Sequence, residues 1–185
     1  MGRRLLISIA FGLMTAVAAA CTGPGDPGDN TTDSLPSQAE SSTADESEPT
    51  PDEAAEAAVE AYWKAVDEAA AIPDPDYDAL QEVATGQALQ AAQDIAQSMV
   101  DQDQKQNGLA VISDTTVLER TPEEDPTTIL IELCMDTSTA VIVDAGTEVP
   151  VEGEEYGRRG SRAEVLKSAD GWVVDVVNVQ ELGSC

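Results

Sequence analysis

Two residue patterns that follow one another along the chain constrain its fold more than any other feature. In residues 51–108, large apolar side chains recur at helical spacing, as Val59, Tyr62 and Val66 do, while charged residues such as Asp67 fall largely off this stripe. Beyond this region, β-branched residues take over in short runs that are separated by turn-forming residues. Helices that precede a set of antiparallel strands predict a fold of the α+β class.

Local signals place the expected elements. Thr50 and Glu53 flank Pro51 as in a capping box, which predicts that the first helix starts there, and Pro73 ends it. Asp170-Gly171 predicts a tight hairpin, because glycine tolerates a positive φ. We expect shorter helices around 77–85 and 86–100, a polar turn at 101–108, and strands over 109–120, 127–136, 141–143, 159–168 and 172–182.

The N-terminus carries an export pattern. Arg3 and Arg4 precede an apolar run over residues 5–20 that ends in small residues, as in a secretory signal. The run is shorter than the stretch of about 20 apolar residues that a comfortable membrane span needs. Cys21 follows Ala18-Ala19-Ala20 directly, which resembles a bacterial lipobox. The resemblance implies that residues 1–20 are a lipoprotein signal peptide and that Cys21 is acylated with fatty acids such as palmitate. The alternative is an ordinary secretory signal that leaves Cys21 as a free thiol.

Residues 21–50 differ in composition from the rest of the chain. They are rich in Pro, Gly, Ser, Thr and acidic residues, and Leu35 is their one large apolar residue. Such a segment cannot bury enough apolar surface to offset the entropy lost on ordering, so we expect a disordered tether. Residues 51–185 then form one domain, whose size suits a single hydrophobic core.

The charge and the missing histidine exclude several functions. Nine Lys and Arg oppose 36 Asp and Glu, a formal net charge of −27, which excludes nucleic-acid binding through clustered cations. The chain has no His, which is the commonest ligand for transition metals and the usual general base near neutral pH. We therefore predict no metal site and no cofactor, and no motif in the sequence identifies a catalytic residue.

The number of cysteines supports both export and anchoring. Three cysteines in an exported chain leave one over when two pair. Acylation of Cys21 accounts for the odd one, and we predict a disulfide between Cys134, on an expected strand, and the C-terminal Cys185. The alternatives are two buried reduced thiols or catalytic thiols. The lack of a His that would activate a thiolate disfavours catalytic thiols.

The element order and two local features carry a resemblance. Tyr62-Trp63 lies on the first helix, and Asp170-Gly171-Trp172 precedes alternating apolar residues. In these features residues 52–185 resemble the nuclear-transport-factor-two-like superfamily, also called the cystatin-like α+β cone, and within it the secreted actinobacterial lipoproteins that mostly lack an assigned activity. The resemblance implies that the helices pack in the concave face of a curved antiparallel sheet. An unrelated small α+β domain is the alternative.

Candidate ligand residues lie in both halves of this domain. Tyr62 and Trp63 are candidates for lining a pocket, with a core role as the alternative. Arg158, Arg159 and Arg162 form a cluster that could hold an anionic ligand or simply neutralise nearby acids, and we take Arg162 as the candidate.

These observations favour a non-catalytic domain, lipid-anchored at the outer face of the cell membrane, that binds a small molecule or an envelope protein. The resemblance to the cone superfamily implies an alternative, a lyase or isomerase that uses a buried Asp or Tyr in the cone, because its enzymes do acid–base work there. It also implies a third, a structural subunit that forms a homodimer or another complex through its sheet.

Overall fold

The structure, a computed structural model, describes residues 48–185. The expected signal peptide at 1–20, the expected acylation site Cys21 and residues 21–47 of the expected tether lie outside the described residues. Within residues 48–185, no helix is both long and apolar enough to cross a membrane.

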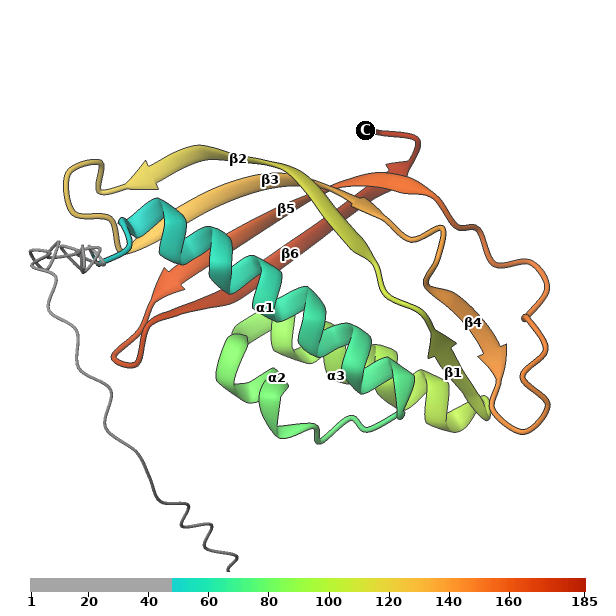
Figure 1. The fold of residues 1–185 in the computed structure, drawn as a ribbon. Coiled ribbons are helices and arrows are strands. Elements are labelled where there is room, and N and C mark those ends of the chain that lie inside the picture. Colours follow the sequence, from blue (N-terminus) through green and yellow to red (C-terminus); the bar gives the residue numbers. More distant parts are fainter. Residues whose placement is uncertain (1–47) are drawn as a thin grey trace, which may run out of the picture. The chain divides into compact units, whose positions relative to one another are not determined.

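The first helix, α1, spans Pro51–Ala71 and begins at the predicted capping box (Figure 1). The backbone N–H of Glu53 donates to the Thr50 hydroxyl (3.3 Å), and the Thr50 N–H donates to the Glu53 carboxylate (2.8 Å). Both groups thereby gain partners at a helix end, where backbone amides otherwise have none. Pro73 follows the C-cap residue Ile72, so the helix ends where the sequence predicts.

Two shorter helices follow, α2 over Asp78–Val83 and α3 over Gly86–Asp101. Thr85 stands at the N-cap of α3, but its side chain makes no capping hydrogen bond. Its backbone N–H instead donates to Val174 O (2.8 Å), which fastens the junction of α2 and α3 to the last strand of the sheet.

Four antiparallel strands form the main sheet in the order β2-β3-β5-β6. Their bounds are Val111–Thr121 for β2, Thr128–Asp136 for β3, Arg158–Lys167 for β5 and Trp172–Leu182 for β6. The hairpin between β5 and β6 turns at the predicted Asp170-Gly171 pair, where Gly171 has a φ of 139°.

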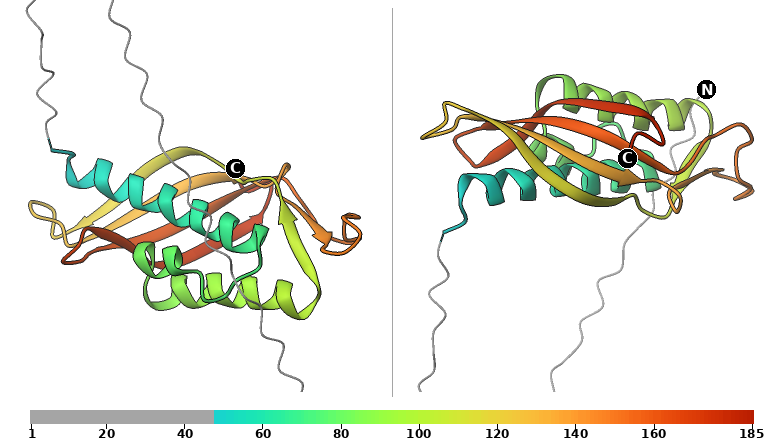
Figure 2. Two further views of the ribbon diagram at one scale, coloured as in Figure 1. Left: turned by 60° about the horizontal axis from the view of Figure 1, so that its bottom comes forward. Right: turned by 90° about the horizontal axis from the view of Figure 1, so that it is seen from above.

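One face of this sheet packs against the helices, and no helix of residues 48–185 covers the other face (Figure 2). Every second side chain of the central strands points inward and is buried, namely Ile129, Ile131, Leu133 and Met135 on β3 and Ala163 and Val165 on β5. The predicted α+β class, with helices packed in the concave face of a curved antiparallel sheet, is confirmed.

One strand departs from the prediction. The polar segment Gln104–Asn107, expected as part of a turn, forms β1 and pairs with β4 (Val141–Asp144) in a separate two-stranded sheet. The partner strand supplies backbone hydrogen bonds, and such pairing overrides the weak strand propensity of Lys and Asn. Together with the end of α3, this small sheet borders one end of the main sheet (Figure 1).

Candidate functional site

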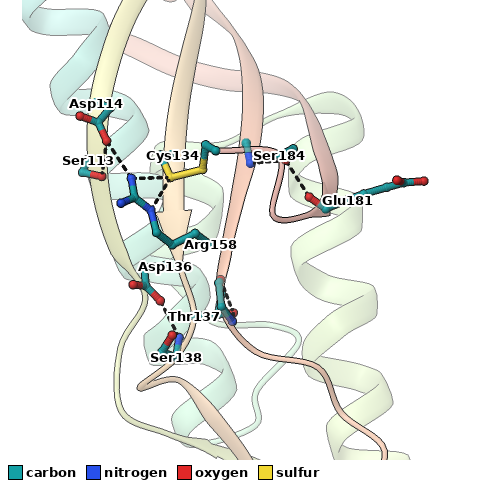
Figure 3. Close-up of a disulfide and its surroundings, with 12 residues drawn as sticks. Ser113, Asp114, Cys134, Asp136, Thr137, Ser138, Arg158, Glu181 and Ser184 are labelled. Carbon is teal, nitrogen blue, oxygen red and sulfur yellow. Dashed lines mark hydrogen bonds and ion pairs between the residues drawn. A yellow bond between two sulfur atoms is a disulfide. The ribbon is translucent and has the colours of Figure 1, made fainter.

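The predicted cysteine pair is bonded in the structure (Figure 3). The sulfurs of Cys134 and Cys185 are 2.03 Å apart, and the bond ties the C-terminus, just past β6, to β3. The guanidinium of Arg158 lies against this disulfide. Its Nη2 donates to Cys134 Sγ (3.2 Å), and its Nε donates to the same sulfur (3.3 Å). Nη2 also donates to the Asp114 carboxylate (3.0 Å). Because Cys134 follows the inward-facing Leu133, the disulfide lies on the outer face of the sheet, away from the helices.

The three candidate ligand residues do not converge on one site. Arg162 lies on the outer face, where its Nε donates to Glu132 on β3 (2.7 Å). Tyr62 belongs to the core: it is 2% exposed, its hydroxyl donates to Ala88 O (3.2 Å), and burial raises its pKa to about 12. Trp63 meets the Tyr62 ring edge-on, with the centroids 5.2 Å apart, and it lines a cavity.

This cavity lies at the end of the sheet where α1 and α3 finish. Its volume is about 220 Å³. Its apolar lining residues are Trp63, Val66, Ile95, Met99, Ala110, Met135, Ala140 and Ile142, and its polar ones are Asp67, Gln106, Thr137, Glu155, Tyr156 and Arg159. An apolar hollow with a few polar groups is the usual form of a small-molecule site.

Two residues that line the cavity each carry a buried donor with no hydrogen-bond partner in the structure. One is the indole nitrogen Nε1 of Trp63, and the other is Nε of Arg159, which follows the outward-facing Arg158 and therefore points toward the helices. Nη2 of Arg159 donates to the backbone oxygen of Glu155 (3.0 Å) and so orients the guanidinium. Buried donors are nearly always bonded in folded proteins, so these two unbonded donors set this cavity apart as a candidate site. A third unpartnered buried atom in residues 48–185, Ser161 Oγ, does not line the cavity.

Asp67 is a buried carboxylate in the same wall, although the sequence analysis placed it off the apolar stripe. It is 5% exposed; its Oδ1 accepts a hydrogen bond from Gln106 Nε2 (2.6 Å) and its Oδ2 accepts one from the Ala110 N–H (2.8 Å). Burial raises the pKa of this carboxyl, and the two hydrogen bonds act in the opposite direction. Asp67 therefore links α1 to β1 and to the start of β2, and it holds that end of the cavity in shape.

The prediction about Asp67 was wrong because it took too narrow an apolar stripe, with Ala70 as its one alanine. The buried face of α1 also includes four further small residues, Ala55, Ala58, Ala65 and Ala69, and this wider face includes Asp67. Counting these alanines as core residues would have placed Asp67 inside the buried face.

A larger hollow, of about 880 Å³, lies between the junction of α2 and α3 and the hairpin of β5 and β6. Trp172, Lys167 and Thr85 are among the residues that line it. None of the unpartnered buried polar atoms of residues 48–185 faces this hollow. The smaller cavity is therefore the better candidate site. No group of three His, Cys, Asp or Glu side chains within residues 48–185 is placed to hold a metal ion.

We compared the chain with protein-family models, curated proteins and solved structures, and matches were found only among solved structures. No protein-family model matches the sequence, and no curated protein matches it significantly. Fourteen chains of solved structures match, among them the crystal structure of the intermembrane space region of the chloroplast protein ARC6. That likeness has 22% sequence identity and a TM-score of 0.49 and covers 68% of this chain and 92% of that chain. At this identity and TM-score, it carries no argument about function.

Proposed function

We propose that the protein is an extracytoplasmic lipoprotein, held at the outer face of the cell membrane through acylated Cys21, whose folded domain binds a small molecule in the cavity beside Trp63 and Arg159. The observation that carries the binding proposal is that two residues lining one apolar cavity each hold a buried donor without a partner. An unbonded buried donor costs about 1–3 kcal/mol, and a bound acceptor would recover that cost.

We also propose that the domain belongs to the nuclear-transport-factor-two-like superfamily. The order of helices and strands, and the position of α1 against the concave face of the sheet, support this assignment. The candidate site lies between α1, α3 and the strands, and a cavity within the cone is what this assignment implies.

The anchor is tested at Cys21. Cys21→Ala removes the thiol that would be acylated, so the variant should appear in the soluble fraction, whereas the unsubstituted protein should sediment with membranes. Cell fractionation with immunodetection measures this. The Cys134–Cys185 bond of the variant should stay intact, because it lies within the folded domain. Equal membrane partitioning of both proteins would contradict the anchor.

Native mass spectrometry of the full chain, purified from its host, tests ligand binding. We expect a mass increment that disappears on denaturation. Trp63→Phe should abolish it, because an aromatic side chain is kept while the Nε1–H donor is lost. Trp172→Phe is the matched control, since Trp172 does not line this cavity, and it should retain the ligand. The absence of any increment, or an equal increment in the two variants, would contradict binding at this cavity.

The enzyme alternative, a lyase or isomerase, has weaker support. Asp67 and Tyr156 both line the cavity, as that alternative requires. Each oxygen of Asp67, however, already accepts a hydrogen bond, and Tyr156 Oη accepts one from the Ile142 N–H (2.9 Å). These bonds suit residues that shape a binding site better than they suit a general base that must reach a substrate proton.

A docking role for the outer face of the sheet also has weaker support. Ion pairs cross this face, such as the pair of Arg162 with Glu132 and the pair of Arg158 with Asp114. These charged pairs lie on the face itself, whereas an interface patch is usually a continuous apolar area.

A further inference from the structure

The distribution of ion pairs sets Arg159 apart from every other cation of the folded domain. Residues 48–185 contain seven Lys and Arg side chains, and six of them pair with a carboxylate. The pairs are Lys64–Glu68, Lys105–Glu148, Arg120–Asp52, Arg158–Asp114, Arg162–Glu132 and Lys167–Asp125. Arg159 alone has no carboxylate partner within the described part of the chain, although the protein carries four acidic side chains for every basic one.

Arg159 also lies where the lack of an anionic partner is most unfavourable, because part of its guanidinium is removed from water. Its side chain is half-buried in the cavity, and its Nε is fully buried without an acceptor. A guanidinium that is removed from water is unfavourable unless an anion compensates it. Trp63 lines the same cavity, and its buried Nε1–H lacks an acceptor as well. A single carboxylate has two acceptor oxygens, enough for both donors, and hydrogen bonds between charged groups are about twice as strong as neutral ones.

We infer that the cavity selects a small monocarboxylate with a compact apolar body, and that Arg159 and Trp63 Nε1–H hold its carboxylate. The inference rests on the proposed function and names the class of ligand. Val66, Met99 and Ile142 supply apolar contacts for the body of the ligand. At about 220 Å³ the cavity is smaller than the pockets of about 300–1,000 Å³ that take drug-sized ligands, so the ligand is small.

The charges around the cavity weigh against a ligand that carries two negative charges. Asp67 and Glu155 line the same cavity as Arg159. A dianion would therefore meet two acidic residues with only one cation to offset them, and like charges within a few ångströms repel strongly at a partly buried site. A neutral ligand would leave Arg159 without a counterion.

Three probes of similar shape separate these cases: benzoate, the neutral benzamide and the dianion phenyl phosphate. The full chain has two Trp residues, so the indole N–H resonances of Trp63 and Trp172 provide a site signal and an internal control. We expect benzoate to shift the resonance of Trp63 and leave that of Trp172 in place. We expect calorimetry to show that benzoate binds at least about tenfold more tightly than either of the other probes. A difference of this size corresponds to one charge-assisted hydrogen bond.

Arg159→Gln should weaken benzoate binding by at least about tenfold and remove the preference for benzoate over benzamide. Arg162→Gln is the matched control: it lies on the same strand and also removes one charge, but it faces the other side of the sheet, so benzoate binding should be unchanged. Arg159→Lys keeps the charge and should retain the preference for the anion. An intact Cys134–Cys185 bond and an unchanged thermal melt establish that each variant is folded.

Several results would overturn the inference: equal affinity for benzoate and benzamide, equal affinity for phenyl phosphate, or the same loss in Arg162→Gln as in Arg159→Gln. If no probe shifts Trp63, the monocarboxylate class is wrong. The proposed function is judged separately, because a native ligand detected by mass spectrometry and lost in Trp63→Phe would still support the cavity with a different ligand.

Discussion

Replacing Cys134 and Cys185 together by serine will lower the free energy of unfolding by about 4 kcal/mol. The disulfide closes a loop with a sequence separation of 51, and without it the unfolded chain gains the entropy that this closure removes. Few single features of a domain this size contribute as much, since total stabilities are about 5–15 kcal/mol. Guanidinium unfolding curves of the oxidised protein and of the double variant, followed by tryptophan fluorescence, measure the difference.

The lower stability of the double variant should result mainly from the greater entropy of its unfolded state, and not from lost contacts in its folded state. In the folded state other bonds hold the C-terminus: the Gly183 N–H donates to Arg158 O (2.7 Å), and the Gly160 N–H donates to the Ser184 hydroxyl (2.8 Å). The slope of unfolding free energy against denaturant should therefore rise, because the uncrosslinked chain exposes more surface when unfolded. Arg158→Gln, which keeps the crosslink, is the control and should change stability far less. A loss below about 1 kcal/mol would contradict the prediction.

The sequence predicted those parts of the fold that depend on neighbouring residues. The capping box at Thr50 and Glu53 is local, and it placed the start of α1 correctly. The Asp170-Gly171 turn is also local, and the strands on either side of it match β5 and β6 to within a residue or so. The disulfide followed from counting cysteines in a chain for which the sequence predicts export.

The site could not be predicted in the same way, because it depends on which face each side chain takes. Arg158, Arg159 and Arg162 look alike in the sequence, but a difference of one position along a strand moves a side chain to the opposite face. Arg159 shares its face with the buried Ala163 and Val165, four and six residues further along β5, and this parity was the available signal. β1 could not be predicted at all, since its polar residues form a strand only through pairing with β4.

Tyr62→Ala should cost about 3–5 kcal/mol of stability, as large-to-small substitutions of buried aromatic residues do. Tyr62 is among the largest fully buried side chains within residues 48–185. Its ring packs against Trp63 and its hydroxyl reaches Ala88 at the start of α3, so its removal leaves a hole between the two long helices. Denaturant unfolding of the variant measures the loss, and a change below about 1 kcal/mol would show that Tyr62 is not the core residue described here.

Two conservative substitutions separate the core role of Tyr62 from the ligand role of its neighbour. Tyr62→Phe keeps the ring and loses only the hydrogen bond to Ala88, so it should cost about 1 kcal/mol and leave benzoate affinity unchanged, because Tyr62 does not line the cavity. Trp63→Phe should weaken benzoate binding, because it removes the Nε1–H donor from the cavity wall. If Tyr62→Phe instead weakened binding as much as Trp63→Phe, the ligand would lie deeper between the helices, against Tyr62 itself.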